Sequence, residues 1–120
     1  MTLSNIGSGQ AASIMERKRR MIQEVTVTPK QLQVILSGNI YVEDAQAIRE
    51  SLIGYIDQGN SSISIDLSDV DYIDGSGLGA LALVNKQAQM KGGRVEIKGL
   101  RGRIKELFEL TRLNKVFEII

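Results

Sequence analysis

The feature that most constrains the fold is a repeated alternation between short β-branched stretches and longer amphipathic ones. Residues 62–67 place apolar side chains at alternating positions, which is the period of a strand. Between residues 44 and 59 the apolar side chains recur at spacings of three and four, which is the period of a helix. A chain of 120 residues with this alternation is long enough for one domain and too short for two.

The remaining patterns extend the alternation to the order β-β-α-β-α-β-α. Two alternating stretches joined at Pro29-Lys30 predict a β-hairpin that closes in a turn at residues 37–39. The expected elements are strands at 24–28 and 31–36, a helix capped by Asp44, a strand at 62–67, a helix through Lys91, a strand at 94–98, a third helix after a turn at 99–102, and a short strand or docked tail at 116–120. Crossover connections make the strands after the hairpin parallel.

We therefore expect an α/β protein. Its mixed sheet should have four or five strands, with an antiparallel N-terminal hairpin, parallel βα crossovers and helices packed on it. Ligand-binding loops in such sheets lie at the carboxyl ends of the parallel strands. The sequence predicts such a loop after the strand at residues 62–67, within the segment 68–79.

Residues 1–22 differ in composition from the rest of the chain. Ser, Gly, Asn and Gln dominate as far as Ser13, and the basic run Arg17-Lys18-Arg19-Arg20 follows. We interpret this segment as a flexible basic tail and residues 23–120 as the folded domain. A disordered or solubilising extension is favoured over a short helix that contacts acidic lipid or a partner. No membrane contact of the tail is expected.

The chain contains no cysteine and no histidine. This absence excludes disulfides, thiol nucleophiles, Ser-His-Asp hydrolysis and nearly all zinc sites. We therefore expect a binding protein without cofactor or metal rather than an enzyme. No stretch approaches the roughly 20 apolar residues that cross a bilayer, and the N terminus lacks the apolar core of a signal peptide. A cytoplasmic location is expected.

Charges are segregated along the chain, although the formal net charge is only +1. Between residues 43 and 74 a single base, Arg49, accompanies the acids Glu43, Asp44, Glu50, Asp57, Asp66, Asp69, Asp71 and Asp74. The last third of the chain, from Lys86 onward, is basic. Such asymmetry can steer a charged partner, but a solvated face of mixed use is the simpler interpretation.

The turn Asp74-Gly75-Ser76-Gly77-Leu78-Gly79 is the strongest candidate site. Gly77 and Gly79 fall in the first turn of the predicted helix, where a glycine costs about 0.5–1 kcal/mol relative to alanine. We expect Gly75 to adopt a positive φ, Ser76 to be the N-cap and Leu78 to lie near the surface as an anchor for a partner. An ordinary capping serine is the alternative. A phosphate on Ser76 would meet free amides and the positive end of the helix dipole.

Other interpretations of these residues fit the sequence less well. The glycine spacing departs from the dinucleotide-binding pattern, and the phosphate-binding Gly-Lys-Ser/Thr is missing. Asp69, Asp71 and Asp74 are possible Mg²⁺ or Ca²⁺ ligands, but caps and turns explain them better. Asp66 follows an apolar strand as an aspartyl-phosphate nucleophile would, yet Ser68 replaces the second acid. A metal-dependent phosphate enzyme that uses Asp66, Asp69 and Asp74 is the weakest alternative.

The stretch from Ile65 to Gly79, followed by Lys91-Gly92-Gly93 and by residues 107–113, resembles STAS domains of the anti-sigma factor antagonist class. The likeness runs from about Glu24 to Ile120. It implies that an ATP-dependent anti-sigma factor kinase phosphorylates Ser76 and that the unphosphorylated chain binds the anti-sigma factor. It also implies that a PP2C-type phosphatase resets the switch. The implied partner-binding residues are Asp74, Gly75, Ser76, Gly77, Leu78, Gly79 and Tyr41.

The same resemblance implies no nucleic-acid partner and no small-molecule substrate. The sequence departs from the family pattern at two places. The acids that often follow the second strand are replaced by Gly38-Asn39-Ile40-Tyr41, and Gly75 stands where Ser or Thr is usual. These departures favour, as the alternative, a STAS scaffold or partner module of a larger signalling or membrane-associated complex that lacks a phospho-switch.

Overall fold

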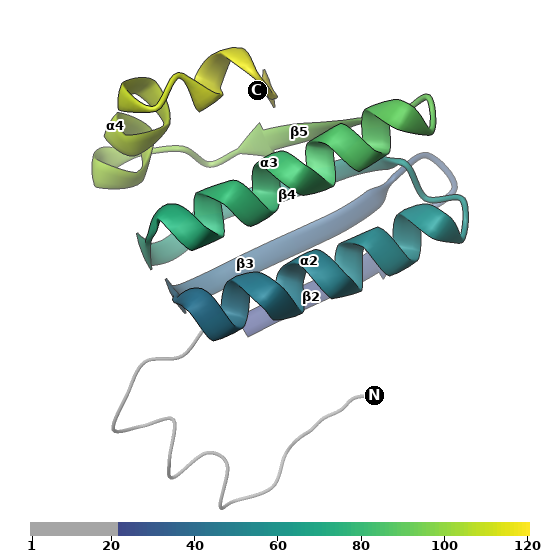
Figure 1. The fold of residues 1–120 in the computed structure, drawn as a ribbon, viewed down its shortest axis with the longest axis horizontal. Coiled ribbons are helices and arrows are strands. Elements are labelled where there is room, and N and C mark those ends of the chain that lie inside the picture. Colours follow the sequence, from purple (N-terminus) through teal and green to yellow (C-terminus); the bar gives the residue numbers. More distant parts are fainter. Residues whose placement is uncertain (1–21) are drawn as a thin grey trace, which may run out of the picture.

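A five-stranded mixed sheet organises residues 22–120, which are the residues that the computed structural model describes (Figure 1). The strands lie in sequence order and are β2 (Ile22–Val27), β3 (Leu32–Ile40), β4 (Ser62–Ile73), β5 (Arg94–Lys98) and β6 (Glu118–Ile119). Strand β2 is antiparallel to β3, and every later pair is parallel. The predicted fold class is confirmed. The predicted tail lies outside the described residues except for Ile22, which opens β2.

Two long helices cover one face of this sheet. Helices α2 (Val42–Asp57) and α3 (Gly75–Met90) run side by side along the direction of the strands, and α4 (Gly102–Leu110) follows β5 (Figure 1). A 3₁₀ turn at Leu113–Lys115 leads into β6. Successive right-handed crossovers that add strands in one direction leave their helices on the same face. Because β3, β4 and β5 are parallel, the helices that follow them start at the same end of the sheet, where these strands finish.

The core lies between the sheet and the helices. Strand β3 alternates between buried and more exposed positions, and its inward residues Leu32, Leu36 and Ile40 are fully buried. They meet apolar residues of α2 and α3, among them Leu52 and Leu81. The Phe108 and Phe117 rings, with centroids 5.9 Å apart, add α4 and the C-terminal segment to the same core.

Both central strands are longer than the sequence patterns predict. Strand β3 continues to Ile40 and β4 to Ile73, so the expected turn at residues 37–39 and the expected loop after residue 67 are wrong. The two extensions pair with each other as far as Ile40 opposite Ile73, with shifts of register that fit extra β4 residues. Their backbone groups are satisfied by this pairing, and burial of Val70 and Ile73 adds to it.

Helix α2 starts at Val42, before its predicted cap. Its N-cap is Tyr41, and Asp44 lies at the third helical position. The Asp44 carboxylate accepts a hydrogen bond of 2.9 Å from the backbone N–H of Tyr41. Asp44 therefore stabilises the start of the helix by reaching back to the cap residue, as the acid of a capping box does.

Buried Asn85 joins three elements. Its side chain, 2% exposed, leaves α3, and its Oδ1 accepts a hydrogen bond of 3.1 Å from the Val95 N–H of β5. Its Nδ2 donates to the Val116 carbonyl near the C terminus at 3.3 Å. One amide thus satisfies backbone groups of two segments that are distant in the sequence.

We expect Asn85→Ala to lower the free energy of unfolding by about 2–3 kcal/mol, because the Val95 N–H loses its partner in a buried site. Urea denaturation followed by circular dichroism measures this loss. Gln89→Ala, an exposed change on the same helix, is the control and should stay within about 0.5 kcal/mol of the parent. A loss no larger than that of the control would contradict the structural role of Asn85.

Candidate functional site

The candidate site lies where the paired ends of β3 and β4 turn into helices. Ile40 and Ile73 are opposite each other, and each is followed by a single residue, Tyr41 or Asp74, before the next helix begins. The Tyr41 ring packs against the ring of Tyr72 with centroids 5.5 Å apart. The strand ends thus place the starts of α2 and α3 next to one another, and with them the predicted residues Tyr41 and 74–79.

Asp74, and not Ser76, caps helix α3. The Asp74 Oδ1 accepts a hydrogen bond of 3.0 Å from the Gly77 N–H, and Ser76 is the second residue of the helix. Gly75 does not have the predicted positive φ. The N-cap therefore lies two residues earlier than the sequence patterns indicate, directly after β4 ends at Ile73. An aspartate at that residue is a strong N-cap.

This correction leaves the Ser76 hydroxyl free of a capping role. Ser76 is exposed, and its hydroxyl forms no hydrogen bond with any residue in the described range 22–120. The free backbone amides of the first helical turn remain close to it. A hydroxyl in this position can be modified without breaking an existing contact of the fold.

Leu78 is a core residue and not the predicted surface anchor. It is 6% exposed and belongs to the buried apolar cluster. Its position two residues after Ser76 turns it to the opposite face of the helix, toward the sheet. The exposed apolar side chains near the site are instead Val42, Tyr72 and Leu83, which are 60%, 46% and 41% exposed. They were not predicted.

The three glycines of the turn have different structural reasons. A Cβ at Gly77 would lie 2.6 Å from Ile73 Cγ1 and 2.9 Å from Ile40 Cγ2, so the close approach of α3 to the strand ends requires glycine there. A Cβ at Gly75 or Gly79 would meet nothing within 4 Å. The fold itself therefore gives no steric reason for Gly75 and Gly79, and both lower helix stability.

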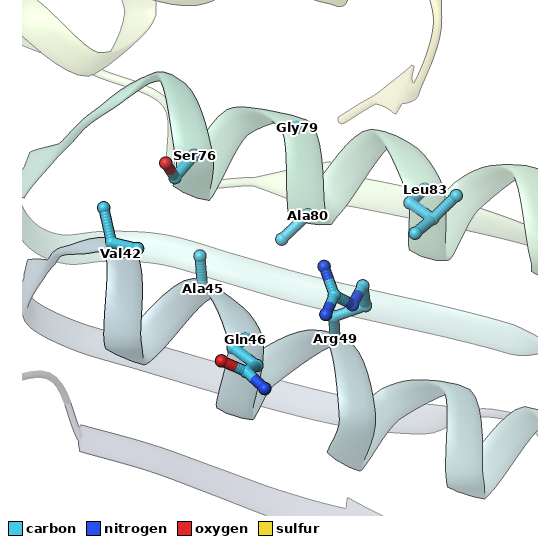
Figure 2. Close-up of a pocket in the computed structure, with 8 residues that line it drawn as sticks. All are labelled: Val42, Ala45, Gln46, Arg49, Ser76, Gly79, Ala80 and Leu83. Atoms are coloured by element: carbon cyan, nitrogen blue, oxygen red, sulfur yellow. The ribbon is translucent and has the colours of Figure 1, made fainter.

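A groove of about 350 Å³ runs between α2 and α3 next to Ser76 (Figure 2). Its lining residues are Val42, Ala45, Gln46 and Arg49 from α2, and Ser76, Gly79, Ala80 and Leu83 from α3. Sequence analysis did not single out the α2 residues as part of the site. Their spacing of three and four places them on one helical face, and Arg49 had already stood out as the lone base of its segment.

Asp66 and Asp74, two of the aspartates considered for a metal-dependent site, have structural roles. Asp66 accepts hydrogen bonds from the backbone N–H and the hydroxyl of Ser68. Its partial burial favours the neutral acid, but these hydrogen bonds and the charge of Lys98 outweigh that effect and lower the pKa of Asp66. Asp74 is the cap of α3. Among residues 22–120 no three acidic side chains are grouped closely enough to hold a metal ion.

The model of the STAS domain family matches residues 22–120. The anti-sigma-B factor antagonist of Bacillus subtilis is 32% identical over 96 residues, which cover 80% of this chain and 87% of that protein. The chain therefore belongs to the STAS domain family, and anti-sigma factor antagonists are among its relatives.

Solved structures share the fold at lower sequence identity. An anti-sigma factor antagonist from Mycobacterium paratuberculosis superposes with a TM-score of 0.74 at 22% identity and covers 83% of this chain and 85% of its own. The Bacillus cell fate determinant SpoIIAA in its phosphorylated form gives a TM-score of 0.69 at 18% identity, with coverage of 82% and 91%. Within residues 22–120 no helix is long and apolar enough to span a membrane.

The glycine analysis predicts opposite effects for two alanine substitutions in one helical turn. Gly77→Ala should lower the free energy of unfolding by about 1–3 kcal/mol, because its methyl group overpacks the contact with Ile40 and Ile73. Gly79→Ala should raise it by about 0.5–1 kcal/mol. Urea denaturation of both variants measures the two effects. Destabilisation by Gly79→Ala would show that the fold does need this glycine.

Proposed function

We propose that this protein is an anti-sigma factor antagonist that binds and sequesters an anti-sigma factor while Ser76 is unphosphorylated. The observation that carries the proposal is the exposed Ser76 hydroxyl, which has no partner among the described residues and lies beside an open groove. Gly75 and Gly79 flank it although the fold gives no steric reason for them. A relative named as an anti-sigma-B factor antagonist supports the same assignment.

The glycines are the natural place for a partner to approach closely. Because a Cβ at Gly79 would point into open space, its absence lowers the surface of α3 at the groove. Exposed Val42 and Leu83 supply apolar contact area at the groove. We propose that the anti-sigma factor covers this surface, together with Tyr41 and the turn at residues 74–79. The chain acts there as a binding partner and a kinase substrate, without catalysis of its own.

Phosphorylation would change this surface without unfolding it. A phosphoserine at the second position of α3 carries about 1.5–2 negative charges and lies near the free amides and the positive end of the helix dipole. This negative charge adds to those of the Asp74 and Glu43 carboxylates, which line a common cavity at the helix starts. Two like unit charges about 8 Å apart at an effective dielectric of 20 repel each other by about 2 kcal/mol before screening, so a partner that brings negative charge to this surface would bind less tightly.

The partners of this switch are proposed with it. An ATP-dependent anti-sigma factor kinase transfers phosphate to Ser76, and a PP2C-type phosphatase removes it. The phosphorylated form of SpoIIAA, which shares the fold, shows that this architecture is compatible with phosphorylation in that protein. We place the exchange in the cytoplasm, where ATP and sigma factors are found.

Incubation with an anti-sigma factor kinase and ATP should add one phosphate per chain, and peptide mass spectrometry should place it on Ser76. Ser76→Ala should abolish the modification. Ser62→Ala, at an exposed serine that starts β4 at the other end of the sheet, should leave it unchanged. Phosphate on another residue in the parent chain would refute the assignment of Ser76.

Ser76→Asp should weaken binding of the anti-sigma factor about tenfold or more, because it adds a negative charge at the proposed contact surface. Gly79→Gln should weaken binding without a change of charge, since its side chain enters the groove. Isothermal titration calorimetry measures both, with Ser62→Asp as the matched control.

The alternative function makes a different prediction for the same variants. A scaffold module without a phospho-switch fits Asn39 and Tyr41, which stand where family members often carry acids; the Tyr41 ring packs against Tyr72 instead. In that case Ser76→Asp would bind its partners with unchanged affinity. Equal affinities of Ser76→Asp and Ser62→Asp would therefore support the scaffold.

A further inference from the structure

Arg49 forms no ion pair with any residue of the described range 22–120, although its surroundings in the sequence are acidic. It is the single base between residues 43 and 74, a stretch with the eight acids named above. In the described part of the chain the Arg49 guanidinium forms no ion pair with any of them. An arginine next to so many carboxylates in sequence is held apart from them by the fold.

The groove between α2 and α3 is where this side chain points. Arg49 is half-buried and extends from α2 toward α3, below Ala80 and Leu83 (Figure 2). Among the residues that the structure describes, no carboxylate and no other base lines this groove, so Arg49 is its only charged side chain there. The polar groups that share the groove are the Gln46 amide and the Ser76 hydroxyl.

Arg49 and Ser76 line the same groove, about one helical turn apart along α3. Ala80, above the guanidinium, lies four residues after Ser76 on the same face of α3, which corresponds to about 6 Å of helical rise. Ala45 and Ala80 are small and leave the floor of the groove open between the two groups. Figure 2 shows the Ser76 hydroxyl directed away from Arg49, so a phosphate enters this space once the Ser76 side chain rotates about χ1.

We propose that Arg49 is the internal ligand of a phosphate on Ser76. This inference rests on the proposed function, because it requires that Ser76 be phosphorylated. The guanidinium donates two parallel hydrogen bonds to the phosphate oxygens, a geometry in which arginine exceeds lysine. Phosphorylation then has two effects on the partner surface: it adds charge, and it draws Arg49 along the groove so that the space over Gly79 is filled.

Other charged groups near the turn also affect the phosphate pKa: the carboxylates oppose Arg49, whereas Arg103 acts in the same direction as Arg49. Glu43 of α2 and Asp74 before α3 lie at the helix starts, and Asp71 of β4 and Arg103 of α4 line a separate cavity on the other side of the turn. The carboxylates favour the singly charged phosphate and raise its second pKa, whereas Arg49 favours the doubly charged form and lowers it. Removal of the Arg49 charge should therefore raise the second pKa of the phosphate, whereas removal of one of the carboxylates should lower it.

The test uses the full chain with phosphoserine placed at position 76 by genetic encoding, so that no kinase is needed. Titration followed by ³¹P NMR gives the second pKa of the phosphate. We expect Arg49→Gln to raise this pKa by about half a unit or more relative to the parent. Arg49→Lys, which keeps the charge and loses the paired hydrogen bonds, should give an intermediate value. Lys86→Gln, an exposed base of α3 outside the groove, is the control and should leave the pKa unchanged.

A pKa in Arg49→Gln equal to that in Lys86→Gln would overturn the proposal. A second measurement observes the arginine itself, and Arg49→Lys serves only to assign its resonance. In ¹⁵N-labelled protein, the side-chain Nε–H resonance that Arg49→Lys removes should shift when phosphate is present on Ser76, and an unchanged resonance would also overturn it. Neither result depends on a kinase or an anti-sigma factor. Failure of kinase labelling at Ser76 would refute the proposed function and leave the measured Arg49 contact standing.

Discussion

The parallel pairing of β3 with β4 is the interaction on which the rest of the structure depends. It extends from Leu32 opposite Ile63 to Ile40 opposite Ile73, and it is the longest ladder in the described residues. Since both strands end at the same level and each is followed by one residue, α2 and α3 begin side by side. The site exists because two chain reversals separated by more than thirty residues in the sequence are brought to one edge of the sheet.

Much of the fold was predictable because its periodicities are local. The alternation at residues 62–67 and 94–98 and the helical spacing after Asp44 identify strands and helices without tertiary information. The ends of β3 and β4 were not predictable in this way. Ser37-Gly38-Asn39 and Ser68-Asp69 are typical of turns, and only their mutual pairing across the sheet holds them as strand.

The structure corrects several details of the candidate site that the sequence predicts. The sequence identified residues 74–79, but the cap fell on Asp74, Gly75 proved to be ordinary in conformation, and Leu78 turned inward. Each of these differences follows from the extra length of β4, which shifts the start of α3. The groove residues on α2 were missed because no local signal links them to Ser76. Two packed helices bring them together, and helix packing is a tertiary contact.

The short connection between β4 and α3 would restrict how the proposed kinase recognises Ser76. Ile73 before it and Gly77 and Leu78 after it are buried, and only one turn residue separates strand from helix. Drawing this segment into an extended conformation would pull a strand end and a helical turn out of the core. An enzyme that modifies Ser76 must therefore read the folded surface of the domain, including α2, and a short peptide with the same residues would lack most of what that enzyme recognises.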